Sequence, residues 1–234
     1  GYAIPGPLFN INPSLQSSAA RNFVTLASNY GDQTQTSNSV SLNVSARPRN
    51  GLVFQGGFNT AQTLIDSCDI RTAIPESAAV NPYCNTNTGF VTRFTALGSY
   101  TFPKIDVQIA GTMRSDQGAN LAANWAAPNA VIAPSLGRNL SNSAPSATVN
   151  LIEPGTLYGD RLNEIDLRFA KILRFGRTRT NVGVDIFNLM NRAPVLTYNP
   201  AFVLPTAANP KGSWLTPTSV LQPRFFKISA QIDF

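Results

Sequence analysis

The chain has 234 residues, of which 43% are hydrophobic and only 13% are charged, and its net charge is +6. No run approaches the about 20 apolar residues that a membrane-spanning helix requires, so a helical membrane protein is excluded. The basic residues form no stripe of the kind that nucleic-acid-binding proteins carry, and the lack of histidine removes the commonest general base and metal ligand.

Eight segments in which apolar and polar residues alternate predict eight β-strands, because successive side chains of a strand point to opposite faces. The low charge at a mean hydropathy of −0.05 agrees with such alternation, which β-barrels and soluble β-sandwiches share. Short turns and long loops alternate between the segments. The predicted strands span residues 22–30, 39–47, 52–63, 90–102, 104–114, 159–175, 178–190 and 224–234.

The short turn Gly176-Arg177 sets the register of the two strands that it joins. It fits a two-residue type II′ hairpin, which requires glycine in its first position. This turn predicts Arg168 opposite Asp185, so that opposite charges meet across the strands on their polar face. We expect this pair to face the lumen of a barrel and to contribute roughly 0–1 kcal/mol if it is solvated.

The turn that ends at Gly51 makes a prediction of the same kind. Residues 49–51 fit a three-residue hairpin loop with Gly51 in a left-handed conformation, and this loop pairs Ala46 with Phe54. In both hairpins the turn chemistry and the alternation of the strands give one register. Such agreement between local and global patterns favours a foldable sheet.

The two cysteines, Cys68 and Cys84, lie in the polar connection of residues 64–89. We interpret them as a loop disulfide formed in an oxidising compartment. The alternative is two free thiols, which are usually buried rather than placed in such a stretch. In the chain-entropy model a bridge over a loop of this size stabilises the fold by roughly 3 kcal/mol.

The last segment alternates strictly up to an aromatic end. Its apolar residues fall on one face and are Phe226, Ile228, Ala230, Ile232 and Phe234. The residues between them are polar or charged. A strand that is apolar toward lipid and polar toward a lumen is typical of an outer-membrane β-barrel, and the pattern predicts the closing strand of one.

The short turns at Gly51, Pro103 and Gly176 fall on one side of the predicted sheet, and the long loops fall on the other. Outer-membrane barrels have short periplasmic turns and long extracellular loops in this way. The predicted fold is therefore all-β: one antiparallel transmembrane β-barrel segment over residues 1–234, with about eight strands. The main departure is Lys171 on the apolar face, which we expect to snorkel to the membrane boundary.

Three aromatic residues stand out in the predicted outer loops, namely Tyr83, Tyr158 and Trp214. Aromatic side chains in such loops can stack on a ligand, and we regard these three as candidate ligand contacts. Packing between the loops is the simpler interpretation, because tyrosine and tryptophan combine a large apolar body with a polar tip that finds a hydrogen-bond partner.

Two groups of carboxylates are candidate sites of chemistry. Glu164 and Asp166 resemble the acid pair of a glycosidase, but they alternate along a strand beside Arg168, which favours a ladder of ion pairs. Asp66 and Asp69 flank Cys68 and have the oxygen ligands that a cation prefers. Solvated loop acids are the simpler interpretation, so no metal site and no catalytic residue are expected.

Several motifs in this order resemble the C-terminal part of the barrel of TonB-dependent outer-membrane receptors. The resemblance is to the large Oar-like kind, common in Acidobacteria, that carries an N-terminal carboxypeptidase-regulatory-like domain, and it covers nearly the whole chain. The motifs are residues Leu26–Asp32, Asp66–Cys68, Asn81–Cys84, Pro154–Arg161, Asp166–Lys171, Asp185–Asn191 and Trp214–Thr218, followed by the terminal Phe234.

The resemblance implies a 22-stranded barrel in the cell outer membrane, plugged by an N-terminal domain. The plug, the TonB-contacting box and most strands would lie outside this chain, whose own first residues lack the basic and apolar regions of a signal peptide. The implied partners are outer-membrane lipid, the remaining barrel and plug, TonB through the missing N-terminal part, and the barrel-assembly machinery. That machinery would read Phe226, Ile228, Ile232 and Phe234. No cofactor and no nucleic acid are expected.

The main hypothesis for function is a part of a receptor that imports a scarce nutrient through its plugged barrel without chemistry on the substrate. One alternative is a small structural or scaffold outer-membrane β-barrel subunit. A second alternative is a secreted soluble β-sandwich that binds a ligand. These hypotheses differ in what should cover the apolar face of the sheet: lipid in the first two, and a second sheet in the last.

Overall fold

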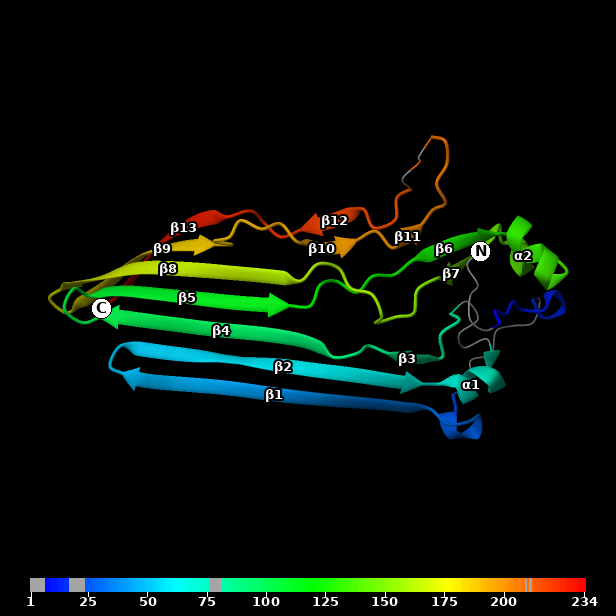
Figure 1. Cartoon of the computed structure of the whole chain (residues 1–234), viewed down its shortest axis with the longest axis horizontal. Coiled ribbons are helices and arrows are strands. Elements are labelled where there is room, and N and C mark those ends of the chain that lie inside the picture. The colour runs from blue at the N-terminus through cyan, green and yellow to red at the C-terminus, as the bar shows by residue number, and fades with distance from the viewer. Residues whose placement is uncertain (1–6, 17–23, 76–80, 209, 211) are drawn as a thin grey trace.

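The structure is a computed structural model that describes residues 7–16, 24–75, 81–208, 210 and 212–234. The predicted all-β class is confirmed, because long antiparallel strands dominate the chain and its helices are short. Figure 1 shows an elongated molecule in which the long strands run side by side. Their hairpin turns lie at one end, which we call the turn end, and the smaller elements gather at the other, the loop end.

The long strands form one main sheet, in which all neighbours are antiparallel. In spatial order they are β1 (Thr34–Arg49), β2 (Leu52–Asp66), β4 (Val91–Phe102), β5 (Val107–Asp116), β8 (Leu162–Phe175), β9 (Thr178–Phe187) and β13 (Phe225–Asp233). A short strand, β3 (Asn85–Asn87), extends the ladder beside β2. The described residues form an open sheet with β1 and β13 at its two edges, and not a closed barrel.

The register of the sheet agrees with the turn chemistry. Arg168 is the ladder partner of Asp185, and Ala46 is the partner of Phe54. The glycines of the two turns have φ angles of +60° and +80°, the left-handed region that glycine adopts at least cost. The predicted three-residue loop is wrong in detail, because Arg49 pairs with Leu52 and leaves a two-residue turn, Asn50-Gly51. A bulge in β1 between Ala46 and Arg49 restores the predicted pairing farther along the hairpin.

The first predicted strand, residues 22–30, is wrong for the part that is described. Residues 22 and 23 lie outside the described residues, and Ala27–Asn29 form a 3-10 turn that is closed by Tyr30 N donating to the Ala27 carbonyl at 2.9 Å. Val24 is 96% exposed and has no ladder partner. The second predicted strand, residues 39–47, corresponds to β1, which begins earlier, at Thr34, because the polar stretch before residue 39 pairs with the second half of β2.

Two other predicted strands are shorter than expected. β5 begins at Val107 rather than at residue 104, because Asp106 adopts a φ of +51° within the preceding turn. β9 ends at Phe187 rather than at residue 190, because Asn188 has a φ of +49° and turns the chain out of the ladder. Left-handed residues of this kind interrupt a strand whatever its hydrophobic pattern.

The connections predicted as plain loops contain structure of their own. The helices are α1 (Cys68–Ala73) and α2 (Asn129–Leu136), and the 3-10 turns are Pro13–Leu15 and Ser141–Ser143. The strands are β6 (Asn124–Pro128), β7 (Ser146–Asn150), β10 (Val195–Tyr198), β11 (Ala201–Phe202) and β12 (Pro217–Val220). β6 pairs antiparallel with β7 and parallel with β11, and β10 pairs with β12. These elements build the loop end.

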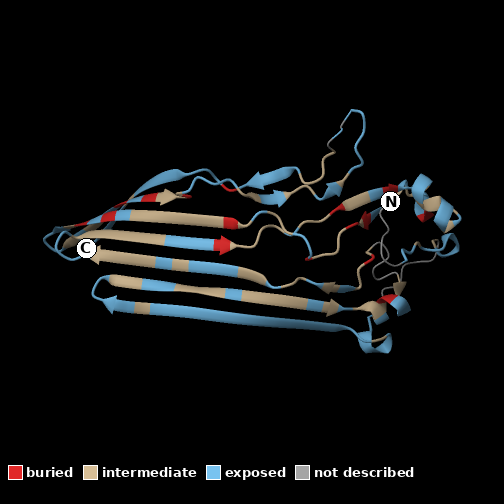
Figure 2. Ribbon diagram, viewed as in Figure 1, coloured by how far each residue is buried: buried red, intermediate tan, exposed pale blue. Residues whose placement is uncertain are grey.

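Most of the buried apolar residues lie outside the main sheet. Figure 2 shows all buried residues, polar and apolar, in red. The cluster at the loop end contains Ala123, Ala127, Val149 and Leu151, each at most 9% exposed. Partly buried side chains pack against it: Trp125, Ile132, Ile152, Phe202 and Trp214. The long strands are mostly intermediate or exposed, and β1 has no residue in the buried class.

Candidate functional surfaces

One face of the main sheet presents adjacent rows of apolar side chains, and we call it the apolar face. Directly paired residues lie on the same face, so the ladder traces each row from strand to strand. The first row runs from β13 to β2 through Ile228, Val184, Phe169, Ile109, Tyr100 and Leu52. The next row runs from β13 to β1 through Phe226, Ile186, Leu167, Gly111, Gly98, Phe54 and Ala46.

The apolar face is uncovered within the described chain. Ile228 is 79% exposed, Phe226 65% and Ile232 60%. In a soluble sandwich these side chains would be packed against a second sheet about 10 Å away. A contiguous apolar surface of this kind marks an interaction site, so the face is the first candidate functional surface of the protein.

Phe234 continues the apolar alternation of Phe226, Ile228 and Ile232, and it is fully exposed, at 103% of its reference area. It therefore contributes little to the packing of the sheet. Its role as a signal to an assembly machinery, together with that of Phe226, Ile228 and Ile232, stays a prediction.

The opposite face, which we call the polar face, carries ion pairs between neighbouring strands. They are Arg93–Asp116, Arg114–Glu164 and Arg168–Asp185, with N···O distances of 2.6, 2.5 and 2.8 Å. One of these pairs contains Glu164, a candidate catalytic acid of the sequence analysis. The side chain of Glu164 holds a guanidinium, and Asp166 accepts hydrogen bonds from Thr112 Oγ1 at 3.4 Å and from the backbone N–H of Asn188 at 2.9 Å.

The Arg168–Asp185 pair is the most enclosed of these contacts. Arg168 Nη1 donates to both carboxylate oxygens, at 2.8 and 3.1 Å, and the Asp185 side chain is 12% exposed. Gly183 makes room for this arrangement, since a Cβ on it would come within 2.9 Å of the guanidinium. The register that Gly176-Arg177 predicts is thus accompanied by an ion pair and by a small residue beside it.

A shallow depression of about 560 Å³ lies over β1, β2, β4, β5 and β8. The polar side chains around it include Asn43, Gln55, Thr95, Arg114 and Glu164. The surface is hydrophilic, but Arg114 and Glu164 are paired with each other, and Asp166 accepts hydrogen bonds from Thr112 and Asn188. It is suited to contact with water or with a polar partner rather than to acid–base chemistry.

Asn188 is a buried polar residue that the sequence pattern did not single out. It is 1% exposed. Its side chain holds together the two ends of the loop over residues 191–223. Asn188 Nδ2 donates to the carbonyls of Arg192 and Gln222, at 2.7 and 2.8 Å, and Asn188 Oδ1 accepts from the N–H of Arg192. Nearby, Asn191 Oδ1 accepts from the N–H of Arg224 at 2.9 Å. Two asparagines with positive φ therefore clamp both ends of this loop.

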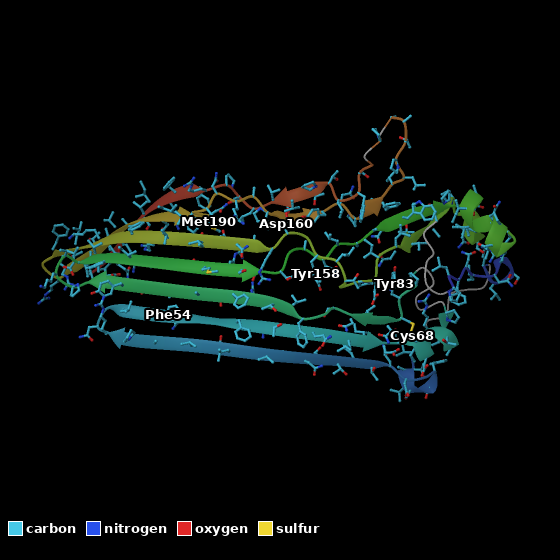
Figure 3. All side chains as sticks on the ribbon, in the orientation of Figure 1. Phe54, Cys68, Tyr83, Tyr158, Asp160 and Met190 are labelled. Atoms are coloured by element: carbon cyan, nitrogen blue, oxygen red, sulfur yellow. A yellow bond between two sulfur atoms is a disulfide. The ribbon has the colours of Figure 1, made fainter. Side chains whose placement is uncertain are left out.

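The structure joins Cys68 and Cys84 in a disulfide at the loop end, next to α1 (Figure 3). The two cysteines are 16 residues apart, and Ser67 N and Ser67 Oγ both donate to the Cys84 carbonyl. Asp66 is occupied locally, because its carboxylate accepts from Cys68 N at 3.0 Å and from Asn85 Nδ2 at 3.1 Å. The described residues hold no cluster of three or more metal-ligating side chains, around this disulfide or elsewhere.

The three candidate ligand-contacting aromatics each tie one loop to another. Tyr83 Oη donates to the Leu151 carbonyl at 2.8 Å, and Tyr158 Oη donates to the Thr88 carbonyl at 3.2 Å. Trp214 Nε1 donates to the carbonyl of Ala122 at 3.0 Å. Figure 3 shows Tyr83 and Tyr158 among the segments between the main sheet and the loop end. The geometry favours the packing interpretation, and contact with a ligand stays a prediction.

Arg161 is a second residue that the sequence pattern missed. Its guanidinium donates to Ser115 Oγ, to the Ser115 carbonyl and to the Thr92 carbonyl, at 2.7, 3.0 and 2.7 Å. It also lies over the Phe94 ring, 5.7 Å from the centroid. Arg161 thereby links the start of β4 and the end of β5, both nearest the loop end, to the start of β8.

Comparisons with protein-family models, with curated proteins and with solved structures gave no match. Within the described residues, no helix has both the length and the apolar character needed to span a bilayer.

Proposed function

We propose that this chain is the C-terminal part of the wall of a TonB-dependent outer-membrane receptor, which imports a scarce nutrient through a plugged barrel. The protein does no chemistry on its substrate. In this proposal the apolar face meets lipid, the polar face lines the lumen, and the loop end is extracellular. The resemblance of the sequence motifs supports the family, and the surfaces described above support the location.

The observation that carries the proposal is the uncovered apolar face. Rows such as Ile228, Val184 and Phe169 present large apolar side chains on strand after strand, while the ion pairs all lie on the other side of the same sheet. β13 has nine residues and β5 has ten. About 9–11 residues are needed for a tilted strand to cross a bilayer.

The sorting of the connections supports the same proposal. The turns that join β1 to β2, β4 to β5 and β8 to β9 lie at one end, together with Phe234, and the elaborated loops lie at the other (Figure 1). Outer-membrane barrels place short turns in the periplasm and long loops outside. The open edges at β1 and β13 would then be completed by further strands of the same wall, because unpaired edges invite pairing.

The experiment that tests the location uses the native disulfide as an advantage, because Cys68 and Cys84 do not react with thiol reagents while bonded. Two variants of the full-length protein are compared, each with one added cysteine: Thr156→Cys at the loop end and Asn50→Cys at the turn end. A membrane-impermeant maleimide should label the first on intact cells and the second only after lysis. Labelling of both positions on intact cells, or a protein that fractionates as soluble, would contradict the proposal.

A further inference from the structure

Positive charge gathers at the turn end of the sheet. Seven exposed cationic side chains lie in the three hairpin turns or in the ladder pairs next to them: Arg47, Arg49, Lys104, Lys171, Arg174, Arg177 and Arg179. The carboxylates of this region are Asp106 and Asp233. The described part of the turn end is therefore strongly basic, although charges of both signs are paired along the middle of the sheet.

Internal contacts do not account for this charge. Arg174 Nη2 lies 2.9 Å from Asp106 Oδ1, which is the one ion pair of the described turn end. On the other side, Arg174 is the direct ladder partner of Arg179, whose own other ladder partner is Asp233. The two carboxylates of the turn end therefore flank this arginine pair. The remaining cations of the described turn end form no ion pair, and an anion from outside would balance their charge.

Two of the cations lie on the apolar face itself. The Arg49 guanidinium lies over the Tyr100 ring, 4.5 Å from its centroid, and Tyr100 meets Phe102 edge to face at the same centroid distance. Phe102 pairs with Val107, and Val107 pairs with Lys171, so Lys171 lies on this face as well. Two aromatic rings thus stand between two cations along the rim of the apolar face, at its turn end.

The surroundings of Lys171 fit a headgroup rather than the bilayer interior. Lys171 is exposed, and its Nζ donates to the carbonyl of Ile105 in the neighbouring turn, which directs the ammonium toward the end of the sheet. Phe169 precedes it by one pleat, farther from the turns, and is exposed on the same face. Long cationic side chains place their stems on apolar surface and their charge in the headgroup layer, where aromatic rings also lie.

We propose that Arg49 and Lys171, with Tyr100 and Phe102 between them, form a binding surface for the phosphate headgroup of an anionic phospholipid. This inference rests on the proposed function, which puts the apolar face in a bilayer. The acyl chains lie over the apolar rows, and the headgroup lies at the cationic rim in the leaflet next to the turns. A free phosphate would instead be drawn to Arg174, Arg177 and Arg179, away from the apolar surface.

The test measures which lipids remain next to the protein. The full-length receptor is reconstituted into phosphatidylcholine vesicles, and spin-labelled phosphatidylglycerol and phosphatidylcholine are compared for the fraction that is motionally restricted. The wild type should prefer phosphatidylglycerol. The double variant Arg49→Gln/Lys171→Gln should lose this preference, by roughly five-fold for each cation removed, and Lys171→Arg should keep it.

The matched control removes the same charge at the same end but from the other face, as Arg47→Gln/Arg179→Gln. It should retain the preference, and an equal loss would show a general field of the turn end and overturn the proposed site. Inorganic phosphate should weaken the preference no more than chloride of equal ionic strength, and specific competition by phosphate would overturn a lipid site. Circular dichroism and protease protection measure insertion into the vesicles independently of the lipid preference. Insertion without lipid preference defeats this inference alone, whereas failure to insert defeats the proposed function as well.

Discussion

The loop end and the main sheet bury their apolar residues in opposite ways. At the loop end, Ala123, Ala127 and Val149 are 2–3% exposed, although they lie in or next to short strands within long connections. In the sheet, Phe226 and Ile228 are more than half exposed, although they belong to a long regular strand. The difference teaches that the loop region covers its own apolar side chains, whereas no described residues cover the apolar face of the sheet; the proposed function assigns that cover to lipid.

The largest effect is expected for Trp214→Ala at the loop end. This change removes an aromatic side chain from the cluster and leaves the Ala122 carbonyl without its indole partner. Aromatic deletions in a core cost about 3–5 kcal/mol. Local unfolding by hydrogen exchange should show this loss in detergent and in vesicles alike. Phe90→Ala is the matched control, because Phe90 is 60% exposed, and it should cost less than about 1 kcal/mol.

The next effect is expected for Ile228→Arg in the apolar face, and it should depend on lipid. An arginine facing the middle of a bilayer destabilises a barrel by about 2–4 kcal/mol. Urea unfolding from vesicles would measure this cost. Gln231→Arg on the polar face of the same strand should be nearly neutral. Equal costs for the two substitutions would show that both faces of β13 meet the same environment, and the contrast between sheet and loops would fail.

Removing the disulfide should affect the loop end and spare the sheet. The double substitution Cys68→Ser/Cys84→Ser frees a loop whose ends are 16 residues apart, and we expect a loss of about 2–3 kcal/mol. Limited proteolysis should then cut within the segment between the two cysteines. Cleavage within β2 or β4 at the same rate would contradict a separation between the two regions.

The smallest effect is expected for the Arg168–Asp185 pair. Its arginine is one-third exposed, so solvent screens the interaction, and a double-mutant cycle with Arg168→Gln and Asp185→Asn should give a coupling of roughly 0–1 kcal/mol. The single variants test the enclosed carboxylate, because Arg168→Gln leaves Asp185 without its partner. A coupling well above 1 kcal/mol would mean that water reaches this ion pair less than the exposure of Arg168 indicates.

The sheet could be predicted from sequence because its signals are local. Period-two alternation marked the long strands, and the glycines at the turns fixed the pairing of Arg168 with Asp185. The same argument failed for residues 22–30, where alternation exists without a partner strand. A pattern of this kind shows which face a strand would bury, but it does not show that a strand forms.

The loop end could not be predicted because its core is assembled from distant segments. Trp125 comes from the connection between β5 and β8, whereas Phe202 and Trp214 come from the connection between β9 and β13, and the three meet at one cluster. Neither of these connections has a hydrophobic periodicity from which β6, β7 or α2 could be predicted. Asn188 was missed for a related reason, since a buried asparagine with positive φ satisfies backbone groups that are nearby only in the folded chain.

The clamp at Asn188 has a consequence for how this protein can diverge. Asn188 and Asn191 hold the two ends of the loop over residues 191–223 to the end of β9 and the start of β13. The positions of the loop's ends are therefore fixed independently of the residues within it. Lengthening such a loop costs only about 0.6 kcal/mol for each doubling of its length. New sequences can therefore be exchanged into the loop without disturbing the ladder below it. Changes in the groups that the loop contacts therefore need not change the stability of the main sheet.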